Sequence, residues 1–511
     1  MNALILVAVV AAQTLPKTTA ERTNYTTTST TAEVGAFLDS LQLAAAPIAV
    51  SEIGTTALGK PIYFVIASDP PVTSRGEADV AGKLVVYIQA NIHGGEVEGK
   101  EAVLAILRDL IGERRDLLRT LVLLVVPNYN ADGNDAFGPQ AQHRSSQNGP
   151  ELIGRRTNGL NLDLNRDYFK AEAPETRAAL ARVFTAWDPA LFVDIHTTDG
   201  TRHGYQLTYA PPLDPNSPAG PATFVRDQML PALRRTLQEK YRRPIFDYGN
   251  VEREGEPKTW DTYDPTGWFG ANYVGLRGRM AILSEAYSHA DFRTRVGVTH
   301  DFVVEILNYV ALRADEIRRL LREADRQTVL EGAGQAPRPE LAVAYRLAGR
   351  GTEPVLLEVS GEIRTLNMAV NDRFIPSKTR TLPAGYFIPA AEAGVAALLR
   401  RHGIQVQRLT AAGSDTVEVL TGTQLTWAAR PFQGHKLLEV TGTYARAART
   451  VPAGTHFVTT AQPLGRLVFA LLEPEGPGLA RWNAFDRLLG GNEFPVWRAI
   501  RPPRSPSRFL P

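Results

Sequence analysis

The chain contains no cysteine among its 511 residues. This absence excludes disulfide bonds, zinc sites built from thiolates, a cysteine nucleophile and a lipid anchor attached through cysteine. An excess of either charge is also missing, because 56 Lys and Arg face 54 Asp and Glu, for a net charge of +2. A chain so evenly balanced gives no reason to expect nucleic acid or a charged membrane surface as a partner. Its composition, 44% hydrophobic and 22% charged, is typical of a globular protein with a large buried core.

Long apolar runs are missing as well, and the run at the N-terminus is short. It covers Leu4 to Ala12, and about ten apolar residues are too few for a helix across a bilayer of roughly 30 Å. With small residues at Val10 and Ala12 before a possible cleavage site, the run is typical of a secretory signal, although no Lys or Arg precedes it. We therefore expect residues 1–12 to be a signal peptide and the mature protein to be exported, periplasmic or extracellular, without stable membrane insertion. The alternative is a slightly apolar N-terminus with no sorting role.

Alternating apolar segments between residues 30 and 330 predict a large α/β domain. Leu84–Ala90 and Leu121–Val126 are continuous apolar runs rich in Val and Leu, which predict strands buried on both faces of a mainly parallel sheet. Between them, apolar residues recur at helical spacing from Ala102 to Ile111, so the order is strand, helix, strand. The same criteria predict a helix from Pro174 to Asp188, strands at Leu191–Ile195 and Met280–Leu283, and a long helix from Phe302 to about Arg322.

The composition changes on both sides of this domain. Residues 13–32 are rich in Thr and predict an extended lead-in, whereas residues 331–339 have the Gly and Pro content of a linker. We predict a smaller β-rich domain over residues 340–500, which either binds a ligand or partner or, as we prefer, only covers the edge of the sheet. Its predicted elements are strands at Thr416–Leu420, Lys436–Val440 and Arg466–Ala470, and one helix at Val395–Leu399.

Two histidines and one glutamate follow predicted strands in a pattern typical of a metal site. His93 and Glu96 lie in the H-x-x-E segment directly after the first predicted strand, and His196 follows the strand that begins at Leu191. Two imidazoles, one carboxylate and a fourth position for water form the ligand set of a catalytic zinc ion, and this mixture favours one Zn²⁺ over other divalent metals. An H-x-x-E is common by chance and a lone histidine is more often structural. The placement of both histidines after buried strands, beside small or polar residues, favours the metal site.

Two further glutamates are near this pattern. Glu285 ends the strand that begins at Met280, so it reaches the same edge of the sheet and is placed to act as the base in metal-assisted hydrolysis. Glu98 competes with Glu96 as a metal ligand, but we expect it to lie on the solvated face of the helix.

A segment rich in Arg and Asn, residues 155–168, predicts an anchor for a carboxylate. Arg166 presents a planar fork that matches a carboxylate with two parallel hydrogen bonds, and Asn165 beside it adds an amide donor. A further arginine aimed at the scissile carbonyl would stabilise the oxyanion formed by water attack. The alternative is a surface loop whose arginines pair with Asp163 and Asp167.

Four motifs occur together in one order: His93-Gly94-Gly95-Glu96, Leu162-Asp163-Leu164-Asn165-Arg166, Asp194-Ile195-His196 and Leu283-Ser284-Glu285. Through these motifs the chain resembles the zinc carboxypeptidases of the carboxypeptidase A family over roughly residues 30–325. The resemblance implies a three-layer α/β/α sandwich with a mixed, mainly parallel sheet. Arg166 is followed by Asp167-Tyr168, where Asn-Phe is commoner, and this is similar to a bacterial branch of the family.

The resemblance also implies roles for individual residues. His93, Glu96 and His196 would be the zinc ligands, and Glu285 would take a proton from zinc-bound water and pass it to the leaving amine. Asn165 and Arg166 would clamp the terminal carboxylate of the substrate. Arg156 is favoured as the carbonyl-polarising residue, with Arg155 as the alternative. For the mobile tyrosine of the family, about twenty residues before the catalytic glutamate, the candidate is Tyr273, only twelve before Glu285.

The implied activity is that of a zinc metallocarboxypeptidase, which hydrolyses the C-terminal peptide bond of peptides. Two other hydrolytic activities fit the same motifs, namely cleavage of cell-wall peptides and deacylation of N-acyl amino acids. A catalytically inactive binding module is the alternative from a different class, and the presence of Glu285 argues against it. The residue that sets the preferred terminal side chain is not identified by the alignment of motifs.

Overall fold

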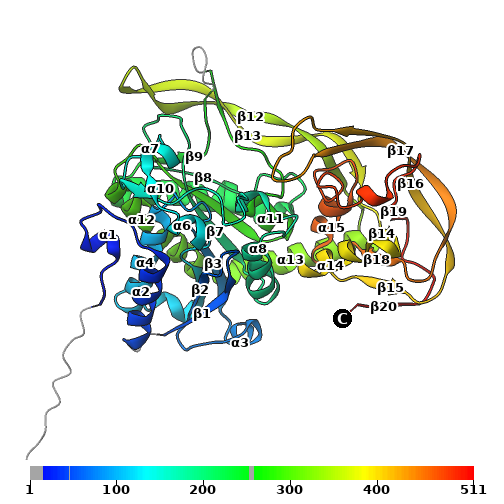
Figure 1. Cartoon of the computed structure of the whole chain (residues 1–511), viewed down its shortest axis with the longest axis horizontal. Coiled ribbons are helices and arrows are strands. Elements are labelled where there is room, and N and C mark those ends of the chain that lie inside the picture. The colour runs from blue at the N-terminus through cyan, green and yellow to red at the C-terminus, as the bar shows by residue number, and fades with distance from the viewer. Residues whose placement is uncertain (1–14, 45–46, 252–257, 511) are drawn as a thin grey trace, which may run out of the picture.

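The computed structural model describes residues 15–44, 47–251 and 258–510 (Figure 1). The expected signal peptide, residues 1–12, therefore lies outside the described residues. Among the helices that are described, none combines the length and the apolarity needed to cross a bilayer.

An eight-stranded mixed sheet forms the centre of the larger domain. Its central strands β4, β3, β7 and β11 run parallel to one another, and every residue in them is buried. The predicted apolar runs are these strands. The strand order across the sheet is β1 (Ile48–Thr55), β2 (Pro61–Ala67), β4 (Leu121–Val126), β3 (Leu84–Ala90), β7 (Leu191–Thr197), β11 (Met280–Ala286), β8 (Leu207–Ala210) and β9 (Ile245–Asp247).

The continuous apolar sequence of these strands is explained by packing on both faces. In β3, Val85 and Tyr87 belong to one hydrophobic cluster, whereas Val86 and Ile88 belong to the cluster on the opposite face. Successive side chains of a strand point to opposite faces, so both sets must be apolar when helices cover both faces. One face is covered by α2 (Thr31–Leu43), α4 (Glu98–Ile111), α10 (Leu230–Tyr241) and α12 (Phe292–Leu312).

The other face is covered partly by the C-terminal region. Here η2 (Leu180–Thr185) and α11 (Gly270–Leu276) share a single hydrophobic cluster with α14 (Ala393–Arg401) and α15 (Gly465–Leu472). The expected α/β/α sandwich with a mainly parallel sheet is therefore confirmed. In addition, its core continues without a break into the region beyond residue 340.

The C-terminal region is rich in β-structure, as expected. Its longest strands, β12 (Glu340–Val359) and β13 (Glu362–Thr381), form a hairpin that runs along the top of the view in Figure 1 and pairs with β10 (Thr259–Asp261) of the larger domain. A separate seven-stranded sheet follows the order β17 (Leu438–Val451), β16 (Gly413–Trp427), β19 (Trp497–Ala499), β14 (Gly385–Ile388), β18 (His456–Thr459), β15 (Gln407–Leu409) and β20 (Ser507–Phe509).

Three sequence-based expectations about local structure are wrong. Residues 466–470, expected as a strand, lie in the helix α15, whose apolar side chains are buried all around. The Thr-rich lead-in contains α1 (Thr19–Arg22), which begins with a capping box at Thr18. The long helix ends at Leu312, and a second helix, α13 (Ala314–Ala333), continues into the expected linker.

The remaining elements of the larger domain are short and connect the strands. They are α3 (Arg75–Val80), α5 (Leu117–Thr120), α6 (Ala131–Asp135), β5 (Gly138–Pro139), α7 (Gln140–His143), β6 (Leu152–Ile153), η1 (Leu164–Arg166), α8 (Pro174–Ala179), α9 (Ala219–Thr223) and η3 (Phe224–Met229). The C-terminal region adds η4 (Ala390–Glu392) and η5 (Asp486–Leu488).

Candidate active site

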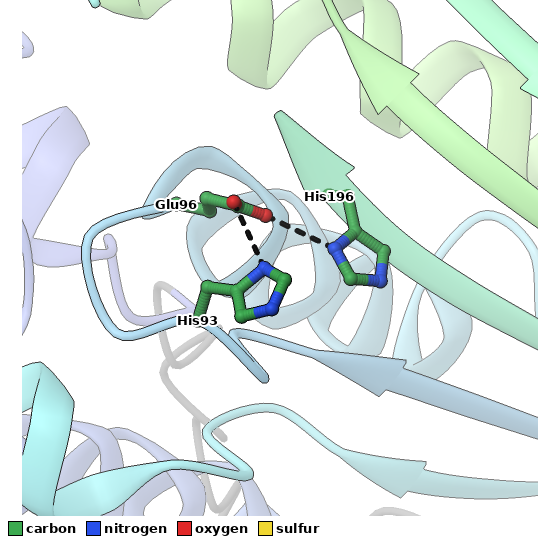
Figure 2. Close-up of side chains that lie close together, drawn as sticks. All are labelled: His93, Glu96 and His196. Carbon is green, nitrogen blue, oxygen red and sulfur yellow. Dashed lines mark hydrogen bonds and ion pairs between the residues drawn. The ribbon is translucent and has the colours of Figure 1, made fainter. Parts of the chain in front are cut away.

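His93, Glu96 and His196 converge at the carboxyl ends of β3 and β7. One ligand atom from each residue lies within 4.8 Å of the other two, and all three residues are buried. Nδ1 of His93 is 2.9 Å from one carboxylate oxygen of Glu96, and Nδ1 of His196 is 3.0 Å from the other (Figure 2). Two imidazole nitrogens and a carboxylate thus face a common point, as a tetrahedral metal site with one open position requires.

Two glycines between His93 and Glu96 let the chain turn this tightly. A Cβ atom on Gly94 would lie 2.2 Å from the carbonyl carbon of Gly133, and one on Gly95 would lie 2.7 Å from the oxygen of Gly154. Both distances are far below van der Waals contact, so neither position accepts a side chain without a backbone shift. The H-G-G-E spacing is therefore required by the close approach of α6 and the following loop.

Carboxylates behind the two histidines orient the imidazole rings. Nε2 of His93 lies 3.1 Å from Oδ1 of Asp163, and Nε2 of His196 lies 3.2 Å from Oδ2 of Asp194. Metal-binding histidines commonly carry such partners, which fix the tautomer and leave the other nitrogen free for the metal. Both aspartates lie in the recognised motifs, but sequence reasoning did not assign them this role.

Arg144 is a further functional neighbour that sequence reasoning missed. Its guanidinium is buried and donates to Glu96 at 2.6 Å and to the backbone oxygens of Thr197 and Thr198. Burial alone would raise the pKa of Glu96, but the charges of His93 and Arg144 outweigh burial and hold this pKa well below its usual value. Glu96 is thus kept ionised. No motif or periodicity marks Arg144, because it comes from a loop between short elements.

Glu285 lies directly beside this cluster. The parallel register of β7 and β11 pairs His196 with Glu285, which is 9% exposed. Both residues line a cavity of about 120 Å³ together with His93 and Glu96. Burial raises the pKa of the Glu285 carboxyl, whereas the neighbouring His196 opposes the rise. A carboxylate in this setting is a strong proton acceptor.

The expected substrate-binding residues Arg156, Asn165 and Arg166 line the same cavity. Nε of Arg156 donates to Oδ2 of Asp163 at 3.0 Å, whereas Arg155 donates to the backbone oxygen of Asn158 and does not line the cavity. Of the two arginines left open by the sequence, the structure therefore directs Arg156 toward the site.

Arg166 lies over the ring of Phe269, 4.1 Å from its centroid, and among the described residues no carboxylate forms an ion pair with it. Beside it, the side-chain oxygen of Asn165 accepts a hydrogen bond from the backbone of Gly270, so its amide group remains free to donate. The alternative of a charge-paired surface loop fails for Arg166, since Asp167 pairs with Lys170 instead.

The structure does not bring Tyr273 to the cavity. Its ring is fully buried in the core, and its hydroxyl lies 2.9 Å from Nδ1 of His402 and accepts from Arg277. Tyr248 and Tyr263 line the cavity instead, and the hydroxyl of Tyr263 has no hydrogen-bond partner among the described residues. Tyr263 lies 22 positions before Glu285 (285 − 263), so the spacing implied by the resemblance was a usable signal that pointed to it.

Glu98 is also placed differently from the expectation. Instead of lying on a solvated helix face, it is fully buried, accepts from the hydroxyl of Thr197 and lies 3.3 Å from Nε of Arg295. Its carboxylate is therefore engaged away from the metal-binding cluster.

The chain is similar to known proteins over most of its length. Residues 34–212 match the zinc carboxypeptidase family. The proteins named carboxypeptidase 2 from Trichophyton equinum and Trichophyton rubrum are 23% and 22% identical over 477 and 478 residues, which cover 86% of this chain and 80% of each relative. Among solved structures, a metallo-carboxypeptidase from Burkholderia cenocepacia has a TM-score of 0.40 at 19% identity, and the match covers 55% of this chain and 68% of the Burkholderia chain. Carboxypeptidase A from Helicoverpa armigera also has a TM-score of 0.40, at 16% identity, covering 57% and 75%.

Proposed function

We propose that the chain, whose residues 34–212 match the zinc carboxypeptidase family, is a zinc metallocarboxypeptidase that removes the C-terminal residue from peptides. The observation that carries this proposal is the position of Glu285. This residue lies outside the matched range, yet it pairs with His196 in the sheet register and lines the cavity that also contains Arg166, which forms no ion pair with any described carboxylate. A base, a metal-binding cluster and a carboxylate anchor thus share one cavity.

The donor set fits zinc. The Nδ1 atoms of His93 and His196 and the carboxylate of Glu96 would hold the ion, since their outer sides are already engaged by Asp163, Asp194 and Arg144. When bound there, zinc supplies a Lewis acid that polarises a carbonyl and activates water. Among the described residues, no further carboxylate is part of the cluster.

Glu285 would move the protons of the reaction. Its carboxylate accepts a proton from the attacking water, and the resulting acid donates that proton to the nitrogen of the leaving amino acid. Burial favours the first step because it raises the pKa of the carboxyl and so makes the carboxylate a stronger proton acceptor. The guanidinium of Arg156, held by Asp163, is placed to stabilise the negative charge that develops on the scissile oxygen.

Arg166 and Asn165 would select the end of a chain. Their free donors bind a terminal carboxylate, which fixes the adjacent peptide bond next to Glu285 and converts part of the binding energy into orientation.

The proposal is tested with pairs of peptides that carry either a free or an amidated C-terminus, with products read by mass. We expect single-residue loss from the free peptides, and amidation to lower kcat/KM by about 10²–10³-fold, because two charge-assisted hydrogen bonds of about 1.5–3 kcal/mol each are weakened. Arg166→Ala should abolish this discrimination. If the protein cleaved only cell-wall fragments or only N-acyl amino acids, that compound class would replace peptides as the proposed substrate. If the zinc-bound protein cleaved none of these substrates, the proposal would be contradicted.

The assignment of the pocket tyrosine is tested by a pair of matched variants. Tyr263→Phe should lower kcat/KM by about 3–10-fold, as expected for loss of one hydrogen bond to substrate, and leave stability unchanged. Tyr273→Phe should lower the stability and leave kcat/KM unchanged, because it leaves His402 and Arg277 without their shared partner in the core. Steady-state kinetics and thermal denaturation of both variants distinguish the two roles, and a kinetic defect confined to Tyr273→Phe would reverse the assignment.

A further inference from the structure

A tight turn of the C-terminal region reaches the active site. It connects β16 to β17, and its two ends, Phe432 and His435, exchange backbone hydrogen bonds of 2.7 and 3.0 Å. The two residues between them, Gln433 and Gly434, have φ angles of +50° and +82°. This backbone is that of a two-residue hairpin turn in which both central residues adopt positive φ. A left-handed conformation is uncommon for a residue such as Gln433.

The side chain of Gln433 binds the active-site segment directly. Its oxygen accepts a hydrogen bond of 2.8 Å from the backbone nitrogen of Asp163, 270 residues earlier in the chain. Asp163 connects three functional groups. One carboxylate oxygen lies 3.1 Å from His93 and accepts from the backbone nitrogen of Asn165 at 2.9 Å, and the other accepts from Arg156 at 3.0 Å.

Packing around the turn fixes its position on the larger domain. The ring of Phe432 lies 6.3 Å from Trp268, and Nε2 of His435 lies 2.9 Å from a carboxylate oxygen of Glu172. Trp268 directly precedes Phe269, the ring over which Arg166 lies. The turn therefore contacts the larger domain on both sides of Gln433, and these contacts place the Gln433 amide.

We propose that Gln433 is a positioning residue of the active site, which holds Asp163 in place and through it His93, Arg156 and the carboxylate clamp. The inference rests on the proposed function and extends it to the C-terminal region, which then completes the active site instead of only covering the sheet. Without the Gln433 oxygen, the Asp163 nitrogen loses its acceptor and the Asp163–Arg166 segment is free to shift. A displacement of about 1 Å in such a segment reduces rates strongly, and loss of outer contacts to a metal ligand weakens metal binding.

The turn geometry allows a variant that separates positioning from folding. Gln433→Gly removes the acceptor but suits the positive φ of this position, so the turn itself should keep its stability or gain some. Gln433→Glu retains an oxygen at the same place and serves as the rescue variant. Gln424→Ala, an exposed position of β16 in the same hairpin, serves as the matched control.

All variants are made in the full chain loaded with zinc, and two quantities are measured. For Gln433→Gly we expect zinc transfer to a competing chelator to be about 3–10-fold faster, below the roughly 10–100-fold effect of direct outer-shell partners. We also expect KM for a free-carboxylate peptide to rise about 10-fold with a smaller change in kcat, and the thermal midpoint not to fall. Gln433→Glu should recover most of both losses, and Gln424→Ala should match the wild type.

Zinc transfer decides the inference whether or not the wild type cleaves peptides. Faster transfer in Gln433→Gly, with recovery in Gln433→Glu, supports the positioning role even if the peptide assay contradicts the proposed function. Wild-type transfer and wild-type KM in Gln433→Gly overturn the inference while leaving the proposed function intact. Equal losses in both Gln433 variants, together with a lower thermal midpoint, would show a role in folding only and would also overturn it.

Discussion

Replacement of Glu285 by glutamine should lower kcat by about 10²–10⁴-fold, the range expected when a general acid–base group is lost. Glutamine has nearly the same shape but accepts no proton from water, so the carbonyl attack and the protonation of the leaving amine both lose their catalyst. KM should change little, because the groups proposed to bind the terminal carboxylate, Asn165 and Arg166, are untouched. The measurement is steady-state kinetics on a free-carboxylate peptide with zinc content determined for each protein.

Glu175→Gln is the matched control for this experiment. Glu175 is also a buried glutamate whose pKa is raised by burial, but it accepts from Asn158 and lies outside the cavity. It should retain wild-type kcat. If Glu285→Gln kept its kcat at full zinc content, the proton would have to be moved by another group of the cavity, for which the acidic candidates are Asp199 and Asp194.

The positions of three catalytic candidates could be expected from the sequence for a simple physical reason. Strands buried on both faces must be continuously apolar, so β3, β7 and β11 were visible, and polar residues at their carboxyl ends had to meet at one edge of the sheet. His93, His196 and Glu285 are such residues. Their convergence is a consequence of parallel strands.

Elsewhere the local pattern was ambiguous. The segment Arg466–Ala470, with four consecutive apolar residues after the arginine, fits a strand as well as a buried helix turn, and its flanking glycine did not decide between them. The choice of Tyr273 was wrong in a different way, because it followed proximity to Glu285 instead of the longer spacing that the resemblance implied.

The roles of Arg144 and Gln433 could not be predicted from local sequence patterns. Each residue reaches the site through contacts with residues far along the chain, Arg144 with Glu96 and Gln433 with Asp163. Contacts of this kind depend on how loops are placed by the whole fold and leave no periodic trace in the sequence. The same is true of the hydrophobic core that passes from the sheet into α14 and α15.

Removal of the metal should have the second large effect. Among variants of the cluster, the loss of zinc affinity should be larger the closer the changed residue lies to the ion. His196→Ala removes a proposed ligand and should weaken zinc binding by more than the roughly 10–100-fold that loss of an outer partner costs. Asp163→Ala should fall within that 10–100-fold range, since it leaves His93 in place but without its orienting carboxylate. His289→Ala, at a histidine away from the cavity, should bind zinc like the wild type.

A chelator titration followed by readdition of zinc measures this ranking. Wild-type activity should disappear with the metal and return with zinc, whereas His196→Ala should remain inactive at zinc concentrations that restore the wild type. The fold should survive in both cases, because the carboxylate of Glu96 is also held by Arg144 and by the backbone nitrogen of Thr197. If His196→Ala kept both zinc and activity, the ion would have to lie elsewhere, and Glu285 would then have no metal beside it and could not act as proposed.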